Sequence, residues 1–395
     1  MTPSRACHLH IRVLIMDEIH DGIILGGGCA GLALAREICM TGKALKVVII
    51  EPRVVYEEDR TWCFWTQVKD TVRPDPAAEW DSWTFSVAGV RIVHRGGTWR
   101  YVLMRSRDYY DHALSVIRSF PHIRLQLGMR AGGIKLDHGL CSVEAGGTRL
   151  LSRWVVDTRP PSQERLAAAP FTQAFCGLEL ETDCDIFDPR AAVLMGDMRV
   201  IDEGFAFDYV LPLTPRRALF EHTVFSRTPP VSSVLSDTCR TRAHAVYGNG
   251  VRYLREERGW IPMGLPLYPD TAGPVIRAGV TGGAVRASSG YAFRRIQRWA
   301  SACALTLANG GAPLAMGLYG SAASFMDRVF LQAMAQHEDR TPGYFLKIAR
   351  ALSGDRFARF MSDEAGAMDW LRIVAALPKR DFLSAMGSAI VRHAR

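Results

Sequence analysis

The sequence predicts an α/β fold in which a β-rich domain interrupts a Rossmann-type nucleotide-binding domain and a helical part follows. Three observations support this prediction. A glycine-rich loop joins an apolar strand to a helix near residue 25, a second strand, glycine turn and helix follow near residue 280, and strand patterns fill much of the chain between them. The nucleotide-binding domain is therefore assembled from segments that lie far apart in the chain.

The first glycine-rich loop has the spacing of a dinucleotide-binding loop. An apolar strand over residues 22–25 runs into Gly26, Gly28 and Gly31, and a helix pattern follows. Gly26 permits a tight turn, Gly28 lets the backbone approach a pyrophosphate, and Gly31 lets the helix pack against the sheet. The helix N-terminus would offer free N–H groups to the phosphates.

An acid at the end of the second strand strengthens this interpretation. The strand pattern Lys46–Ile50 is unbroken and ends at Glu51, about 20 residues beyond the loop. Glu51 can accept hydrogen bonds from both hydroxyls of an adenosine ribose. The alternative is a glycine-rich turn with a solvent-facing Glu51, and the motif alone does not distinguish FAD from NAD(P).

The following elements complete the nucleotide-binding domain and build the second one. Residues 106–120 predict a helix, and a buried strand at Trp154–Val156 ends at Asp157. Residues 169–265 consist mostly of strand patterns. After the second glycine turn the pattern is helical, with helices expected at Arg328–Gln336, Tyr344–Leu352, Asp355–Met361 and Met368–Leu377.

This order of elements is that of a flavoprotein with an FAD-binding, hydroxylase-like two-domain fold. We expect residues 21–65, 106–160 and 270–310 to form the FAD-binding domain, residues 66–105 and 161–269 the β-rich substrate domain, and residues 311–395 a helical C-terminal region. Residues 1–20 would be a disordered leader, or the true start would be Met16 rather than Met1. A cofactor ring at the domain interface would lie where pockets usually form.

Composition and charge exclude several classes of protein. The 395 residues carry a formal charge of +8 without a long basic run, so we expect no nucleic-acid partner. Nine cysteines without a Cys-x-x-Cys pair fit a reducing compartment, and no spacing predicts a metal site. No apolar run is long enough to span a membrane. We therefore expect a cytoplasmic protein. Its positive charge would either be dispersed over a solvated surface or form a weakly basic face that favours an anionic membrane.

Several ordered segments resemble the FAD-dependent lycopene β-cyclases of bacteria and plants. The likeness runs from Asp21 to about Met386 and includes "DRTWCFW", "FTQAFCGLELET", "VLMGDMRV", "FAFDYVLPLT", "EERGWIPMGLP", "AGVTGGAVRASSGYAF" and "SFMDRVFLQAM". Each segment alone is unspecific, but their order is specific.

The resemblance implies a redox-neutral cyclisation of the linear ends of lycopene, or of a related linear carotene, to β-ionone rings. Protonation of a terminal double bond gives a tertiary cation, the neighbouring double bond attacks it, and a base removes a proton. The resemblance implies reduced FAD, with NAD(P)H as the reductant, and a protein peripherally associated with a membrane surface. A dry apolar site is needed because water would quench the cation.

The candidate catalytic residues lie in the stretch "FEHT". The family has two acids before a threonine, and here Glu221 occupies the first position while His222 replaces the second. A carboxyl in an apolar pocket has a raised pKa and can donate a proton near neutrality. On a strand the two side chains point to opposite faces, so only one can face a substrate. The alternative for Glu221 is a surface or salt-bridged strand residue. His222 would be either a proton shuttle or a satisfied polar residue.

The resemblance also implies cofactor contacts outside the first loop. Asp157 would approach the flavin pyrophosphate or cap a turn, and Gly282 and Gly283 lie in the second flavin loop. Ser289 and Gly290, with Ser288, would hold the flavin and cap the next helix.

Two aromatic segments have open alternatives. Trp62, Phe64 and Trp65 would wall a polyene channel, brace the flavin or form plain core. The Arg-rich segment "FRRIQRWA" would lie at a membrane interface, with Trp299 at headgroup depth, or be an ordinary exposed helix face.

Two other functions remain open. A flavin-dependent hydroxylase or a prenyl-chain reductase would use the same fold on a lipophilic substrate. Hydroxylases of this fold carry an Asp after the glycine of the second flavin loop, and here Val280 follows Gly279, which argues against that activity. The histidine at His222 leaves open a non-catalytic paralogue that binds flavin or carotenoid.

Overall fold

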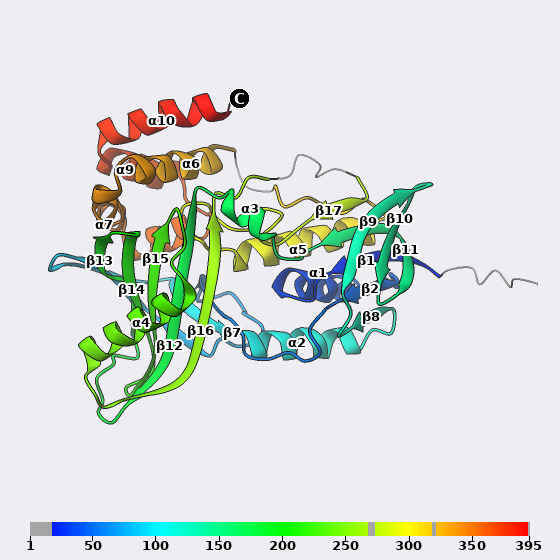
Figure 1. Ribbon diagram of the computed structural model, residues 1–395, viewed down its shortest axis with the longest axis horizontal. Coiled ribbons are helices and arrows are strands. Elements are labelled where there is room, and N and C mark those ends of the chain that lie inside the picture. The colour runs from blue at the N-terminus through cyan, green and yellow to red at the C-terminus, as the bar shows by residue number, and fades with distance from the viewer. Residues whose placement is uncertain (1–17, 268–272, 318–320, 394–395) are drawn as a thin grey trace, which may run out of the picture.

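The computed structural model describes residues 18–267, 273–317 and 321–393, and contains two seven-stranded sheets and a three-stranded one (Figure 1). The proposed leader lies largely outside these residues. The first described strand, β1, begins at Ile19, two residues before the predicted start of the FAD-binding domain. None of the helices in the described ranges has the length and apolar character needed to cross a bilayer.

The first sheet is assembled from distant segments in the order β8-β2-β1-β11-β10-β9, with β17 beside β11. Its strands are β1 (Ile19–Leu25), β2 (Val47–Ile50), β8 (Ile123–Gln126), β9 (Ala131–Asp137), β10 (Leu140–Ala145), β11 (Thr148–Asp157) and β17 (Val275–Arg277). Strands β8, β2, β1, β11 and β17 are parallel. The apolar strands that the sequence predicts at residues 22–25, 46–50 and 154–156 are therefore neighbours in one sheet.

Three helices pack together on one face of this sheet (Figure 1). They are α1 (Cys29–Met40), α2 (Ser106–Arg118) and α5 (Phe293–Ala308), and they share a buried apolar cluster with β1, β2 and β11. The predicted apolar stripe on the first helix is completely buried, because Leu32, Ala35 and Ile38 have no exposed surface. The helices predicted after the first loop and at residues 106–120 are confirmed.

The second sheet has the order β16-β12-β15-β14-β13-β5-β6. Its strands are β5 (Ser82–Val87), β6 (Val90–Arg95), β12 (Phe171–Thr182), β13 (Ala191–Ile201), β14 (Gly204–Thr214), β15 (Arg217–Ser226) and β16 (Val251–Met263). A helix that the sequence does not predict, α4 (Ser232–Tyr247), covers part of one face. It escaped prediction because it buries only Leu235, Ser236, Cys239 and Ala243, a set without a strong apolar stripe.

A small sheet and a short helix link the two parts. Strand β7 (Trp99–Arg105) pairs with β3 (Thr61–Gln67) and β4 (Ala78–Trp80), and leads directly into α2. The short helix α3 (Gln163–Ala167) precedes β12.

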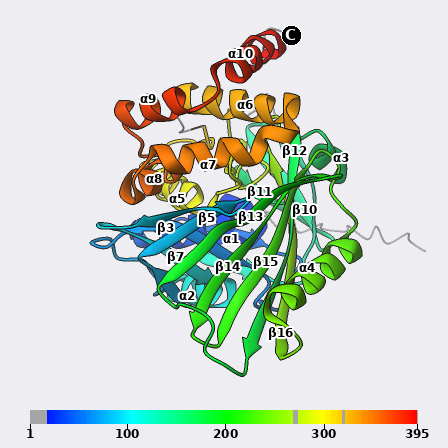
Figure 2. The ribbon, with the colours of Figure 1, turned by 90° about the vertical axis from the view of Figure 1, so that its left-hand side faces the viewer.

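Five further helices lie together on the remaining side of the second sheet (Figure 2). They are α6 (Ser321–Gln336), α7 (Thr341–Ala351), α8 (Gly354–Met361), α9 (Ala367–Ala376) and α10 (Lys379–His393). Helices α7 and α8 lie next to the strands of this sheet, and α10 is outermost, beyond α6. Their apolar side chains join those of β3, β5, β7, β13 and β14 in one cluster. The helical C-terminal part that the sequence predicts is confirmed.

Candidate active site

The glycine-rich loop between β1 and α1 leaves open space in front of the helix N-terminus. Gly26 has a φ of +95°, and a Cβ on Gly31 would lie 1.9 Å from the Gly26 carbonyl oxygen, so both positions require glycine. At Gly28, the N-cap of α1, the nearest atom to an added Cβ would be Arg53 Nη2 at 4.0 Å. No side chain caps this helix, so its first N–H groups remain available to an anion.

Glu51 is buried at the end of β2 and is only 3% exposed, so it is not a solvent-facing residue. Its Oε2 accepts a hydrogen bond from the Gly27 N–H at 2.6 Å, and its Oε1 accepts from the Arg53 N–H and Nε–H at 2.8 and 2.9 Å. Burial alone would raise the pKa of Glu51, but the hydrogen bonds and charge of Arg53 hold it below its ordinary value. The carboxylate therefore braces the loop.

Two other segments meet this loop. Thr158 Oγ1 donates to the Leu25 and Gly26 carbonyls at 2.9 and 3.0 Å, and Thr281 Oγ1 donates to the Arg159 carbonyl at 2.7 Å. The Asp157 carboxylate pairs with Arg159, with Nη2···Oδ2 at 2.8 Å. The segments at residues 26–31, 157–159 and 281–283, each of which contains predicted site residues, therefore lie in one region. The Asp157 side chain is turned towards Arg159.

The second glycine loop, between β17 and α5, lies close to the first one. A Cβ on Gly282 would lie 2.4 Å from the Arg277 carbonyl oxygen, and Gly283 has a φ of +90°. A Cβ on Gly279 would touch Ala30 at 3.3 Å, so this loop packs against the start of α1.

The segment before α5 differs from its prediction. The N-cap of α5 is Ala292, so the helix-capping role expected for Ser288, Ser289 and Gly290 is wrong. Ser288 instead donates to Asp327 Oδ1 at 2.7 Å. The sequence placed the helix start too early because the turn that contains Gly290, whose φ is +77°, intervenes.

Two buried polar atoms beside that turn lack a hydrogen-bond partner among the described residues. They are Ser289 Oγ and Gln173 Oε1. A Cβ on Gly290 would lie 2.3 Å from Gln173 Oε1, so glycine is needed for this approach. Buried polar atoms are normally satisfied, so these two atoms fit a bound polar group such as part of a cofactor.

A cavity lies between the second sheet and helices α6–α10, with about 840 Å³ of empty space when the part open to solvent is included. Most of its lining is aromatic or aliphatic, contributed by β3, β5, β13–β15, the turn before α5 and the C-terminal helices. The polar residues of the lining are Tyr209, Ser288, Ser289, Tyr291 and Asp327. Such a dry wall suits an apolar ligand and disfavours water.

Glu221 lies on β15, on the face of the second sheet that carries the cavity residues Phe225 and Tyr209. It is directly opposite Tyr209 of β14, although it is not itself part of the cavity lining. Its Oε1 accepts a hydrogen bond from Thr223 Oγ1 at 2.7 Å. Burial raises the pKa of Glu221 to about 8, assisted by the negative charge of Glu257.

Two tyrosines link Glu221 to the cavity. Tyr209 and Tyr291 line the cavity, and the pKa values of both are raised, first by burial and also by the charge of Glu221. Tyr291 also exchanges a hydrogen bond of 3.0 Å with Tyr101. The Cys63 thiol, on the small sheet, lies near Glu221 and Glu257. Its pKa is raised by burial and by the charges of these two acids.

Glu257 on β16 lies in the same cross-strand row as Glu221, with only Gly177 of β12 between them. A Cβ on Gly177 would lie 3.1 Å from Glu257 Cγ, so the missing side chain leaves room for this carboxylate. Glu257 Oε2 accepts from Thr61 Oγ1 and Arg255 Nη1, both at 2.7 Å. The two acids have different surroundings: Glu221 has no cationic partner in the described structure, whereas Glu257 is held by Arg255.

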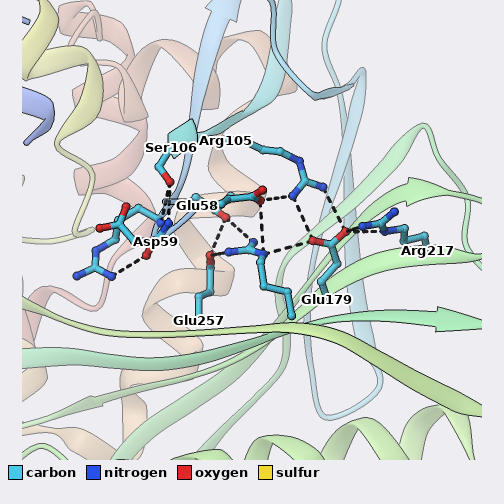
Figure 3. A network of polar contacts seen from close by, with 10 residues as sticks. Glu58, Asp59, Arg105, Ser106, Glu179, Arg217 and Glu257 are labelled. Carbon is cyan, nitrogen blue, oxygen red and sulfur yellow. Dashed lines mark hydrogen bonds and ion pairs between the residues drawn. The ribbon is translucent and has the colours of Figure 1, made fainter. Parts of the chain in front are cut away.

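The charged network in Figure 3 extends from Glu257 along the same sheet. Glu179 of β12 pairs with Arg105 at the end of β7 at 3.2 Å and with Arg217 of β15. The pKa of Glu179 would be raised by burial, but Arg105 and Arg217 hold it below its ordinary value. This network fixes the small sheet against the second sheet beside the two acids.

His222 points to the opposite face of the sheet from Glu221, as the strand alternation predicts. It is 2% exposed, and its Nδ1 lies 2.8 Å from Asp208 Oδ1. Asp208 also binds Arg242 of α4, with Nε···Oδ2 at 2.9 Å. His222 therefore pairs with Asp208 beneath α4, away from the cavity.

The predicted aromatic segment divides into two roles. Trp65 lines the cavity, whereas Phe64 stacks on Phe293 with ring centroids 4.7 Å apart. Trp62 packs edge-on against Tyr109 at 5.2 Å, in the core of the first domain.

The Arg-rich helix α5 is neither a membrane face nor an exposed face. Trp299 has no exposed surface, and its Nε1–H donates to the Leu314 carbonyl at 2.7 Å. Arg295 pairs with Asp363 at 2.6 Å, and Arg298 pairs with Glu364. The arginines mark ion pairs to the segment after α8, which the sequence could not place beside them.

Sequence reasoning did not single out several residues of the site. Tyr209, Tyr291 and Asp327 lie in segments that carry the family resemblance, but their orientation was unknown. Asp327 had a usable signal, because it is a lone acid among the apolar residues Phe325, Met326, Val329 and Phe330. For Glu257 the sequence gives no signal that distinguishes it from the neighbouring Glu256.

Solved structures with this architecture are flavoproteins. A geranylgeranyl bacteriochlorophyll reductase-like protein from Thermoplasma acidophilum is 12% identical, with a TM-score of 0.58 over 94% of this chain and 99% of that one. A halogenase PltM variant in complex with FAD is 11% identical, with a TM-score of 0.55 over 95% of this chain and 96% of that one. At these identities the likeness shows the fold alone, which is that of FAD-dependent hydroxylases, halogenases and reductases.

Sequence comparison gives a narrower relationship. A lycopene beta-cyclase from Paracoccus sp. (strain N81106 / MBIC 01143) is 25% identical over 296 residues, which cover 69% of this chain and 70% of that protein. The family described as "Lycopene cyclase protein" matches residues 21–386, which include both glycine loops, the Glu221 strand and most of the C-terminal helices. The chain therefore belongs to the lycopene cyclase family.

Proposed function

We propose that this protein is an FAD-dependent lycopene cyclase that converts the linear ends of a carotene to β-ionone rings without net oxidation or reduction. The observation that supports this most directly is Glu221, a carboxyl with a raised pKa beside a cavity with a largely apolar lining. A proton donor is needed because the reaction begins by protonating an alkene.

Glu221 would deliver the first proton. Its neutral form exists up to a pH of about 8, so it can donate a proton near neutrality. The terminal double bond of the carotene takes the proton and becomes a tertiary cation, which the neighbouring double bond attacks to close the ring. Loss of a ring proton to the Glu221 carboxylate would form the β-ring double bond and regenerate the acid.

The other groups would shape the path of the cation. The aromatic lining contributed by Trp65, Phe207 and Phe357 can stabilise positive charge through ring faces and exclude water. The charge of Glu257, which lies in the same cross-strand row, would help to raise the pKa of Glu221 and so favour its protonated form.

The residues present fit FAD as the cofactor. Gly26, Gly28 and Gly31, with the uncapped α1 N-terminus, would hold the pyrophosphate, and Glu51 would face the adenosine ribose. Gly282, Gly283, Ser289 and Gly290 would complete the site, together with the segment at Asp157. When bound and reduced by NAD(P)H, the flavin would supply negative charge near the cation.

A prenyl-chain reductase is the second candidate, and the likeness to a reductase-like protein favours it. That activity would consume reductant and add hydrogen to the substrate. A flavin hydroxylase is less well supported, because Val280 occupies the position of its acid. A non-catalytic binder would leave the carotene unchanged.

Carotene analysis of cells that make lycopene separates these functions. Cells expressing the protein should accumulate carotenes of unchanged mass with β-rings. A gain of two hydrogens would identify a reductase, and a gain of oxygen a hydroxylase. An unchanged lycopene pool, from a protein that still purifies with flavin, would leave the binder as the explanation.

A carotene dissolves in lipid rather than water, so we propose that the protein works at the cytoplasmic surface of a membrane. No nucleic acid or metal is required by this reaction.

A further inference from the structure

The outer faces of α9 and α10 carry an unusual set of exposed apolar side chains. Met368, Leu371 and Val374 on α9 are 57%, 59% and 48% exposed, and Leu383, Met386 and Ile390 on α10 are 61%, 37% and 53% exposed. Within each helix they are three or four residues apart, so they share one side. We call these six residues the apolar face.

The same two helices line the cavity with their inner sides. Trp370, Ile373 and Leu377 line it from α9 and its C-cap, and Phe382 lines it from α10. Figures 1 and 2 show both helices at one end of the molecule, beyond α7 and α6. A single layer of helix therefore separates the apolar face from the proposed carotene cavity.

The exposed charges carried by α9, α10 and the turn between them have one sign. Over residues 366–390 the exposed charged residues are Arg372, Lys379 and Arg380. The acids of this stretch, Asp369 and Asp381, are buried, and they pair with Arg356 at 2.7 Å and Arg340 at 2.8 Å. The outer surface therefore combines large apolar side chains with basic ones, as in helices that lie in the interface of an anionic bilayer.

We propose that α9 and α10 dock this protein on an anionic lipid bilayer, with the apolar face in the headgroup layer and Arg372, Lys379 and Arg380 on the phosphates. A two-fold contact with a second copy is disfavoured, because it would bring the same three cations of each copy together. The choice of a lipid partner rests on the proposed function, since a lipid-dissolved carotene would reach the cavity across one helix layer.

Vesicle flotation of the purified full-length flavoprotein tests the docking surface without using its activity. Wild type should float with vesicles of phosphatidylcholine containing phosphatidylglycerol, and much less with phosphatidylcholine alone. Leu371→Glu/Leu383→Glu should lose binding to both. Arg372→Ala/Lys379→Ala/Arg380→Ala should weaken binding to anionic vesicles roughly 100-fold, at about 1 kcal/mol for each cation.

A matched control lies on α4, where Val234 and Val246 are 53% and 56% exposed. Val234→Glu/Val246→Glu should float like wild type. Circular dichroism and flavin content confirm that each variant is folded. Equal flotation of wild type and Leu371→Glu/Leu383→Glu, or flotation of neither, would overturn the proposal. So would a dimer that this variant dissociates while vesicle binding is absent.

Cyclisation assays separate this proposal from the proposed function. With lycopene dispersed in detergent, Leu371→Glu/Leu383→Glu should match wild type, whereas with lycopene in anionic vesicles it should fall at least tenfold. If no protein cyclises lycopene in either assay but flotation follows the expected pattern, the function fails and the docking surface stands.

Discussion

At the scale of single residues, the candidate site depends on the missing side chain of Gly177, which leaves room for an acid on each side. Glu221 and Glu257 lie on either side of it, and any larger residue would press on Glu257 or on Leu219, whose Cδ1 would be 3.2 Å away. The two acids differ in their surroundings. Thr61 and Arg255 donate hydrogen bonds to Glu257, while burial raises the pKa of Glu221 and favours its neutral form.

Glu221→Gln should lower cyclisation roughly 10²–10⁴-fold, the usual effect of removing a general acid. Glutamine keeps the size and can still accept a hydrogen bond from Thr223, but it cannot exchange a proton. His222→Asn serves as the matched control on the same strand and should cost much less, because His222 faces Asp208 beneath α4. Turnover of lycopene is measured with the flavin content of each variant. A near-normal Glu221→Gln would direct the search to Asp327, the acid of the cavity lining.

The rate of the reaction should fall at alkaline pH. Cyclisation by wild type should decline as the pH rises through about 8, because Glu221 then loses the proton that it must donate. Glu257→Gln should move this decline to lower pH, since the negative charge of Glu257 helps to raise the pKa of Glu221. Rate–pH profiles of both proteins check this, and a Glu257→Gln profile that shifts towards alkaline pH would contradict it.

The same group makes stability depend on pH. A carboxyl whose folded pKa is raised binds more protons in the folded state, so its contribution is complete below its unfolded value and is lost as the pH rises through about 8. Glu221→Gln should therefore gain stability relative to wild type between about pH 4.5 and 8. Urea unfolding of both proteins at pH 4, 6 and 8 measures the difference, and a constant difference would exclude a raised pKa.

At the scale of elements, the sequence predicted those helices and strands that interactions between nearby residues determine. The strand, loop and helix of β1 and α1 were predictable because glycine spacing and an apolar stripe decide them within 20 residues. Helix α4 was missed because its burial depends on β12 and β15, which are distant in sequence. Helix α5 was misread because its arginines pair with Asp363 and Glu364, which lie 68 and 66 residues away.

The candidate site was predictable only in part, for the same reason. Strand alternation placed Glu221 and His222 on opposite faces, which the structure confirms. The row of Glu221, Gly177 and Glu257 depends on the pairing of β15, β12 and β16, and local patterns do not reveal which strands pair or in which register. Likewise, nothing in the local pattern indicated that a turn at Gly290 would precede α5.

The loop between β1 and α1 offers a test at the same scale. Gly28→Val should abolish flavin binding, because the added side chain would fill the space in front of the α1 N-terminus while touching little of the protein itself. Gly42→Val provides a control at a glycine with open space, although its φ of +69° makes some loss of stability expected. Absorbance spectra of the purified proteins report flavin. A Gly28→Val protein with stoichiometric flavin would contradict this site.

At the scale of the whole molecule, the fold of flavin oxidoreductases would serve a reaction that transfers no electrons. The two domains have separate roles, because the first sheet and its two glycine loops would hold the cofactor, while the second sheet and helices α6–α10 enclose an apolar cavity. The charged network around Glu179 and Arg105 joins them beside the acids.

The stoichiometry of reductant tests this separation of roles. Under anaerobic conditions, protein reduced once with dithionite or NADPH should convert many equivalents of lycopene without further NADPH oxidation, because ring closure returns the proton it consumes and changes no oxidation state. Oxidised protein should be inactive if reduced flavin is needed to stabilise the cation. The measurement pairs carotene analysis with NADPH absorbance in the same vessel, and Glu221→Gln controls for reduction without cyclisation. NADPH loss in step with product would instead identify a reductase, whose substrate gains two hydrogens for each NADPH. In that case Glu221 would protonate the chain that is being reduced.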